Sequence, residues 1–298
     1  MNFSLQSFLN ASPGAIAQGI LWGIMAIGVF ITYKVLDYAD LTVDNSFCTG
    51  GGVSAILIVG GMDPILTLPI AFAAGMLAGA VTGFLHTKLK IPGILSGILT
   101  QLALYSINMR VMQRANVSLL KNDTLLSLKD VPHSILIGLI SVVLIIGFLY
   151  WFFGTELGCS VRATGTNEKM ASAVGINTNR MKMLALMLSN GLVALSGALL
   201  AQYQGYADIN MGRGAIVIGL ASVIIGEVLI GKNRNFAVKL FSTILGGIIY
   251  YLIISLVLQA GLDTNDLKLF SALVVAAALA VPNLKKSSAP KHNKGGEK

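Results

Sequence analysis

Long apolar runs alternate with short polar segments along nearly the whole chain. A helix needs about 20 mostly apolar residues to cross a bilayer, so each run of that length predicts one membrane span. The runs cover residues 14–33, 64–86, 93–112, 133–153, 183–203, 213–231, 236–259 and 267–283. A shorter run, Phe47 to Gly60, contains three consecutive glycines and predicts a broken or half-buried span. The pattern therefore predicts an all-α membrane protein with about nine transmembrane helices, in a range of about eight to ten.

The composition supports a polytopic membrane protein and excludes one large soluble domain. Hydrophobic residues make up 55% of the 298 residues and charged residues only 11%, whereas a soluble domain carries about 25% charged residues. The amino-terminal segment MNFSLQSFLNASPG has no charge. It lacks the basic region of a secretory signal peptide, so we expect the first span to be retained. Cys48 and Cys159 are the only cysteines, too few for a disulfide framework or a zinc site.

The basic residues predict the orientation of the chain. With nine crossings and a cytoplasmic carboxyl terminus, 15 of the 21 basic residues lie in the cytoplasm and six lie outside. This bias follows the positive-inside rule and places the amino terminus outside. The exception is the long loop 110–131, which holds four of the six outer basic residues. Residues 1–283 form the predicted membrane domain. Residues 284–298 predict a basic, disordered cytoplasmic tail that is either solvated or in contact with anionic lipid headgroups.

One polar segment, Arg162–Asn177, lies between two long apolar runs and predicts a short helix over about 166–174. Thr166 is a favoured N-cap residue, and Glu168 places a negative charge in the first turn. Gly175 follows the last helical residue, as a glycine at the end of a helix commonly does. A helix of about two turns is marginal in water by itself, so another surface must hold it.

The predicted short helix has one apolar side and lies in the predicted cytoplasmic loop 154–182. Met170, Ala171 and Val174 fall on that side at helical spacing. The polar residues that bound it are Asn167, Glu168 and Lys169. Two interpretations remain open on spacing alone. Either the apolar side docks in a groove of a soluble partner, or it packs on the ends of the chain's own spans.

Several polar residues are predicted at membrane depth, where such groups are candidates for function. Asp44, Asn45 and Ser46 precede the glycine run, and a helix break there would expose polar groups to a translocation path. Ser189 and Asn190 lie inside a later span and are further candidates for that path. The alternatives are a loop with a flexible glycine turn for the first group and interhelical hydrogen bonds for the second.

The sequence offers no sign of catalytic chemistry. His86, His133 and His292 are scattered and have no clustered carboxylates or cysteines with which to bind a metal. There is no Gly-x-x-x-x-Gly-Lys-Ser/Thr phosphate-binding loop and no pairing of a nucleophile with a base. Glu227 lies near the predicted cytoplasmic end of its span, where a structural ion pair or snorkelling explains it at least as well as a role in transport. We therefore expect no catalytic residue, metal or bound cofactor in this chain.

Four segments carry a resemblance to a known family. They are RATGTNEKMASAVGIN, LALMLSNGLVALSGALLAQYQGYADINMGRGAIVIGLASVIIGE, DLTVDNSFCTGGGVSAILI and GAVTGFLHTKLKIPGILSGILTQLALYSINMRVM. They resemble the permease subunit of an ABC importer of the branched-chain amino acid and ribose type, and most of all its tryptophan/tyrosine-type permeases. The resemblance covers residues 14–282. It implies that the short helix is a coupling helix, which sits in a cleft of the ATP-hydrolysing subunit. The residues implied in that contact are Asn167, Glu168, Met170, Ala171, Val174, Gly175 and Ile176.

The resemblance also implies a substrate class and partners. The chain would form the path for a small solute, an amino acid of the tryptophan, tyrosine or branched-chain type, across the cell membrane. It would work as a homodimer or as one of two paired permeases, with an extracytoplasmic substrate-binding protein and no nucleic acid. ATP and Mg²⁺ would be used by a partner ATP-binding subunit. The alternatives are an ABC permease for a sugar or nucleoside and, in another class, a secondary transporter without an ATPase.

Overall fold

The computed structural model describes residues 5–231, 234–259, 269–270, 272–273 and 275–276, and it is mostly helical in these parts. The elements in the first half are α1 (Leu5–Phe30), the π-helix η1 (Ile31–Val35), α2 (Val43–Val59), α3 (Pro64–Thr87), α4 (Gly93–Met112) and β1 (Asn116–Ser118). Those in the second half are α5 (Val131–Gly154), α6 (Glu156–Thr166), α7 (Glu168–Ala173), α8 (Thr178–Gln204), β2 (Tyr206–Asp208), α9 (Ala215–Ile230) and α10 (Phe236–Gln259). The all-α prediction is confirmed apart from two three-residue strands.

Five of the described helical stretches are long and apolar enough to cross a membrane. They are Asn10–Val35, Pro64–Thr87, Val131–Gly154, Thr178–Gln204 and Phe236–Gln259. α2 and α9 are apolar but shorter, with 17 and 16 residues. The bounds of α4 and α10 coincide with the predicted spans 93–112 and 236–259, but α4 is not among the five stretches above. The predicted span 267–283 lies mostly outside the described residues and the predicted tail wholly so, which leaves the count of about nine crossings a prediction.

α1 and α8 form the centre of the bundle. Within their most apolar 18-residue stretches 78% of positions are buried, compared with 22% in α5. α8 packs against α3, α2 and α1, while α1 packs against α10, α9 and α5. On α5, by contrast, the neighbouring side chains of Val143 and Leu144 are each 68% exposed. An exposed apolar surface of this kind suits contact with lipid or with another membrane subunit rather than water.

The glycine run in α2 does not break the helix, so the predicted break is wrong. Residues 50–52 lie inside the continuous helix Val43–Val59 and are buried. A Cβ atom on Gly50 would lie only 1.8 Å from the carbonyl oxygen of Ala194 in α8. The prediction that the span is short is confirmed. Glycine is present here because two helix backbones touch, as in membrane helix pairs with small residues at their interface.

The spacing of Gly75, Gly79 and Gly83 in α3 likewise predicts close approach of another helix. Cβ atoms on Gly75 and Gly79 would lie 2.3 Å from the carbonyl oxygens of Asn190 and Leu186. Both oxygens belong to α8, so the small-residue face of α3 is used inside the chain. The glycine-containing faces of α2 and α3 therefore both pack directly against α8 within this chain.

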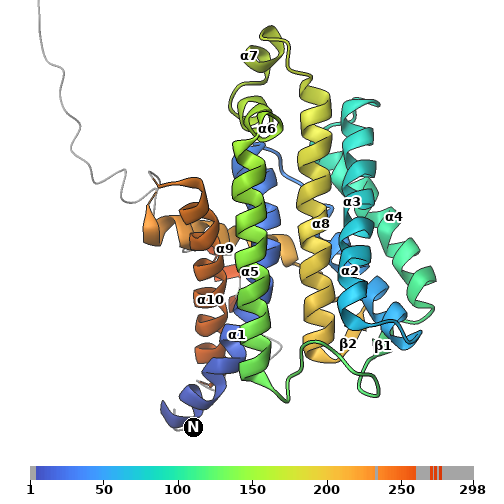
Figure 1. The fold of residues 1–298 in the computed structure, drawn as a ribbon, viewed down its shortest axis with the longest axis vertical. Coiled ribbons are helices and arrows are strands. Elements are labelled where there is room, and N and C mark those ends of the chain that lie inside the picture. Colours follow the sequence, from blue (N-terminus) through green and yellow to red (C-terminus); the bar gives the residue numbers. More distant parts are fainter. Residues whose placement is uncertain (1–4, 232–233, 260–268, 271, 274, 277–298) are drawn as a thin grey trace, which may run out of the picture.

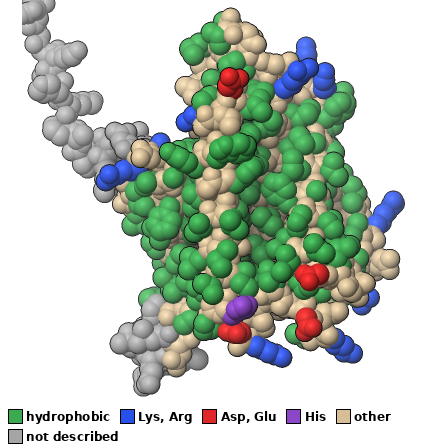
Figure 2. All heavy atoms as spheres, in the orientation of Figure 1, with side chains coloured by type: hydrophobic (Ala, Val, Ile, Leu, Met, Phe, Trp, Pro, Cys, Tyr) green, Lys and Arg blue, Asp and Glu red, His purple; other side chains and the backbone are tan. Residues whose placement is uncertain are grey.

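The two ends of the bundle differ (Figure 1). α6 lies at one end and α7 projects beyond it, while the antiparallel pair β1–β2 lies at the opposite end, where α1 begins. On the face drawn in Figure 2, hydrophobic side chains cover the middle, and most charged side chains lie toward the two ends. We call the end with α6 and α7 the inner end and the end with β1 and β2 the outer end.

Candidate functional site

The polar segment Arg162–Asn177 at the inner end contains the end of one helix, α6, and the whole of a second, α7, instead of the single short helix expected within it. Thr166 is the last residue of α6, where its hydroxyl donates to the carbonyl oxygen of Arg162 at 2.9 Å. Asn167, not Thr166, is the N-cap of α7, and its Oδ1 accepts from the backbone N–H of Met170 at 3.0 Å. Gly175 has φ +87°, which confirms the glycine expected after the helix. The predicted helix over 166–174 is thus shortened to six residues.

The apolar residues of α7 and its C-cap residue Val174 differ in exposure. Ala171 is fully buried against the protein, whereas Met170 and Val174 are 58% and 68% exposed. At the amino-terminal end of the helix, Glu168 forms an ion pair with Lys182 of α8 at 2.7 Å. The hydrogen bond and the charge of Lys182 lower the pKa of Glu168. An ion pair therefore links α7 to α8 on one side. The side chains of Met170 and Val174 remain exposed in the described part of the chain.

α6 connects this short helix to the bundle. A Cβ atom on Gly165 would lie 1.9 Å from the carbonyl oxygen of Val35, so the backbone of α6 touches the π-helix at the end of α1. At its other end α6 is capped by Thr155, whose Oγ1 accepts from the backbone N–H of Gly158 at 3.4 Å. The pair α6–α7 therefore contacts both central helices, α1 through η1 and α8 through Lys182.

The predicted path residues Ser46, Ser189 and Asn190 are fully buried in a polar network among α1, α2 and α8. Ser46 Oγ donates to Oδ1 of Asn190 at 2.6 Å, and Ser189 Oγ donates to the carbonyl oxygen of Gly28 at 2.7 Å. Asn190 Nδ2 donates to Oδ2 of Asp40 at 2.7 Å. These contacts join helices in this conformation, and they place the three residues between helices rather than at an open cavity.

Asp44 and Asn45, the other two path candidates, hold neighbouring elements in place. The carboxylate of Asp44 accepts from the backbone N–H groups of Gly214 and Ile216 at 3.1 and 3.0 Å, and so caps the start of α9. Asn45 Nδ2 donates to the carbonyl oxygen of Gln101 in α4. The structure therefore brings the start of α2 into contact with α4 and α9 as well as with α8.

Asp40 is a buried residue that sequence reasoning missed. It is only 2% exposed, and its Oδ1 accepts from the backbone N–H of Thr42 at 2.9 Å in addition to the bond from Asn190. The partner Asn190 is 150 positions away in the sequence. The available signal was a pair of acidic residues, Asp37 and Asp40, in the short connection between two apolar helices, where a charged group must find hydrogen bonds.

An outer cavity of about 510 Å³ lies beside the strand pair. Polar side chains supply much of its lining, and the buried Trp22 of α1 adds an aromatic wall. The carboxylate of Asp208 accepts from Asn116 Nδ2 at 3.3 Å and from the backbone N–H of Asn210 at 2.8 Å. Trp22 stacks on Phe47 with ring centroids 4.8 Å apart. The cavity thus combines an aromatic ring with one carboxylate and amide groups. The main lining residues are Trp22, Asn116, Gln204, Tyr206, Asp208 and Asn210.

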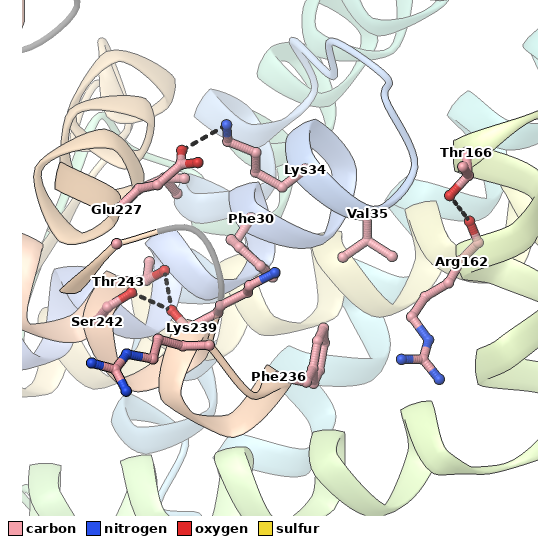
Figure 3. Close-up of a pocket in the computed structure, with 13 residues that line it drawn as sticks. Phe30, Lys34, Val35, Arg162, Thr166, Glu227, Phe236, Lys239, Ser242 and Thr243 are labelled. Atoms are coloured by element: carbon pink, nitrogen blue, oxygen red, sulfur yellow. Dashed lines mark hydrogen bonds and ion pairs between the residues drawn. The ribbon is translucent and has the colours of Figure 1, made fainter. Parts of the chain in front are cut away.

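An inner cavity of about 520 Å³ lies between η1, α6, α9 and α10 (Figure 3). The carboxylate of Glu227 lies 2.7 Å from Lys34 Nζ, which agrees with the ion pair among its expected explanations. Arg162 lies across the cavity from Glu227, and its Nη2 donates to the carbonyl oxygen of Phe153 at 2.8 Å. Lys239 contributes a further positive charge from α10. The inner cavity is thus cationic, in contrast to the outer one.

Comparison with known proteins gives the family of this chain. Residues 14–280 match the family model described as branched-chain amino acid transport system / permease component. The chain is 40% identical over 267 residues to the tyrosine transport system permease protein of Clostridioides difficile (strain R20291), covering 90% of each protein. It is 23% identical to the ribose import permease protein of Escherichia coli (strain K12), covering 88% of this chain and 82% of the relative.

Solved structures show the same fold at low identity. PsaBC from Streptococcus pneumoniae, in complex with Fab, has a TM-score of 0.54 with 17% identity, and the match covers 98% of each chain. The family match and the tyrosine permease both extend over most of the chain, which confirms the expected resemblance. This chain belongs to the family of branched-chain amino acid transport system permease components, a permease family of ABC transporters.

Proposed function

We propose that this chain is the membrane-spanning subunit of an ABC importer and forms the path for an amino acid. Two permease subunits work with two copies of a partner ATP-binding subunit, and an extracytoplasmic binding protein delivers the solute. ATP and Mg²⁺ belong to the partner, so this chain has no catalytic role. The inner end, with α6 and α7, faces the cytoplasm, and the complex lies in the cell membrane with the carboxyl terminus inside.

The observation that carries this proposal is the exposed apolar pair on α7. Met170 and Val174 have no cover in the described part of the chain, and they belong to the segment that projects from the inner end. Apolar side chains on a short helix fit a groove in a soluble partner. Ala171 serves as the internal anchor of the helix, because it is buried. The polar residues Asn167 and Glu168 border this surface, and the turn of Gly175 and Ile176 completes it.

The contacts of α6 and α7 provide a route for the coupling. When the partner ATPase closes, it displaces α7, and the ion pair between Glu168 and Lys182 carries that displacement to α8. The backbone contact of Gly165 with Val35 carries it to η1 and α1. Both central helices therefore move with α7, and the bundle changes its access from the outer end to the inner end.

The substrate we propose is an aromatic amino acid. The outer cavity offers the carboxylate of Asp208 to an ammonium group, amide groups to a carboxylate, and Trp22 to an aromatic ring. The relative from Clostridioides difficile is named as a tyrosine permease, which supports the same class. A sugar is the second candidate, because a ribose permease is also similar and amide groups bind hydroxyls. Uptake of labelled tyrosine and ribose by the assembled complex distinguishes the two.

Co-purification tests the coupling surface. The chain is expressed with its ATP-binding subunit, extracted in mild detergent and captured, and the amount of bound ATPase is measured for wild type, Val174→Asp and Leu120→Asp. Val174→Asp places a charge in the docking surface and is expected to release the ATPase. Leu120→Asp is the matched control, because Leu120 is 80% exposed in the outer part of the chain, beside β1. Full retention of the ATPase by Val174→Asp would contradict the proposal, and absence of ATPase from every variant would favour a secondary transporter.

A further inference from the structure

We propose that the inner cavity binds the phosphate headgroup of an anionic phospholipid. Four cationic side chains and one carboxylate line this cavity of about 520 Å³. The cations are Lys34, Arg162, Arg234 and Lys239, and the carboxylate is Glu227. Basic pockets between membrane helices at the cytoplasmic surface are the general form of a site for anionic lipid headgroups.

The charges on the cavity lining do not balance. Glu227 pairs with Lys34 at 2.7 Å and neutralises that one cation. Arg162 donates to the carbonyl oxygen of Phe153, which fixes the guanidinium group but leaves its charge in place. Arg234 and Lys239 form no ion pair with any carboxylate of the described residues. Three positive charges therefore remain on the lining, and they attract an anion with several acceptor oxygens such as a phosphate.

The surroundings favour a lipid over a free anion. α9 and α10 present exposed apolar side chains next to the lining residues in sequence. These are Val228 and Leu229 on α9 and Val238 and Phe241 on α10. Lys239 lies between the last two in sequence, so the same turn of α10 carries a cation of the lining and exposed apolar side chains. A molecule with a phosphate at one end and acyl chains at the other matches both parts.

The position of the cavity along the membrane-spanning helices also matches the depth expected for a lipid headgroup. Lys34 lies in η1, directly after the 26 residues of α1, and Glu227 lies in the last turn of α9. Lys239 lies in the first turn of α10. These three charged side chains are thus placed at the ends of apolar helices, where the bilayer core gives way to the headgroup region. The inference concerns the lipid surface alone and is independent of the transported solute and of the ATPase.

Native mass spectrometry of the full chain in mild detergent tests the proposal. Phosphatidylglycerol and phosphatidylcholine with the same acyl chains are added in turn, and retained lipid is measured for wild type and for Arg234→Gln/Lys239→Gln. Wild type is expected to retain phosphatidylglycerol preferentially. The double variant should lose about tenfold in affinity for phosphatidylglycerol, since each basic residue near a membrane surface contributes substantially to binding of an anionic lipid.

Three controls decide the outcome. Lys169→Gln/Arg180→Gln removes two exposed cations at the same end but outside the cavity, and it should retain phosphatidylglycerol as wild type does. Arg234→Lys/Lys239→Arg keeps both charges and should also retain it, which separates charge from folding. Inorganic phosphate in large excess should leave the bound lipid in place. Equal retention by wild type and the Gln variant, or displacement by inorganic phosphate, would overturn the proposal.

Discussion

The inner and outer cavities have nearly the same volume, about 520 and 510 Å³, but opposite chemistry. The inner cavity carries Arg162 and Lys239 with other cations, and it borders exposed apolar surface on α10. The outer cavity carries Asp208 and amide groups, and Trp22 forms its aromatic wall. The ligand of each cavity therefore has to be inferred from the residues that line it, because the two volumes alone do not distinguish the two sites.

The region between the two ends is closely packed. α2 and α8 touch along their glycine faces, and the buried network of Ser46, Asn190 and Asp40 joins the same elements. Among the described residues, none lines both cavities. A path through the membrane therefore requires a movement of α2 against α8 or a surface shared with a second subunit, as the proposed pair provides.

The largest expected effect comes from breaking the packed region that separates the two ends. Gly50→Ala places a Cβ atom 1.8 Å from the carbonyl oxygen of Ala194. The α2 and α8 backbones must separate, so we expect a loss of about 3 kcal/mol or more in stability, at the upper end for overpacked sites. The midpoint of thermal unfolding in detergent measures it. Gly147→Ala is the matched control, because nothing lies within 4 Å of a Cβ atom at that position in α5, and it should leave the midpoint unchanged or raise it slightly, since alanine favours a helix more than glycine does.

The same region shows how far the sequence predicts this fold. The long spans are predictable because their apolar length is a local property, as the coincidence of α10 with the expected run 236–259 illustrates. The glycine run 50–52 led to the wrong prediction of a helix break, because glycine both destabilises a helix and allows two helices to approach closely. Only the position of Ala194, far along the chain, decides between these two effects.

The inner site shows a second limit. Thr166 and Asn167 are adjacent residues that both favour an N-cap. Thr166 instead donates to the carbonyl oxygen of Arg162 within α6, which leaves Asn167 to cap α7. That choice depends on whether α6 continues to residue 166, and α6 is held there by η1. The hydrogen bond between Asn190 and Asp40 could not be predicted from the sequence either, because its partners are 150 residues apart.

A smaller effect is expected from changing only the outer cavity. Asp208→Asn keeps the size of the side chain and removes its charge, so an ammonium group loses its ionic partner. We expect about a tenfold increase in KM for tyrosine uptake by the assembled complex, the size of effect produced by losing one hydrogen bond to a charged group. Initial uptake rates over a range of tyrosine concentrations measure it.

Matched measurements decide whether this effect belongs to the outer cavity. Asp123→Asn removes a carboxylate from an exposed position outside the cavity lining and should leave KM unchanged. Retention of the ATPase and of phosphatidylglycerol should be normal in Asp208→Asn, since both are assigned to the inner end. An unchanged KM in Asp208→Asn would exclude this carboxylate from solute binding.

The smallest expected effect concerns the ion pair at the inner end. Lys182 lowers the pKa of Glu168, so the folded state binds a proton there less readily than the unfolded state does. The stabilisation is present above the ordinary glutamate pKa and is lost as the pH falls through the lowered value. Glu168 is exposed, and an exposed pair contributes only about 0–1 kcal/mol. Wild type should therefore unfold at a slightly higher temperature than Glu168→Gln at neutral pH, and the difference should vanish in acid. A difference that grows in acid would contradict the role of this pair in fastening α7 to α8.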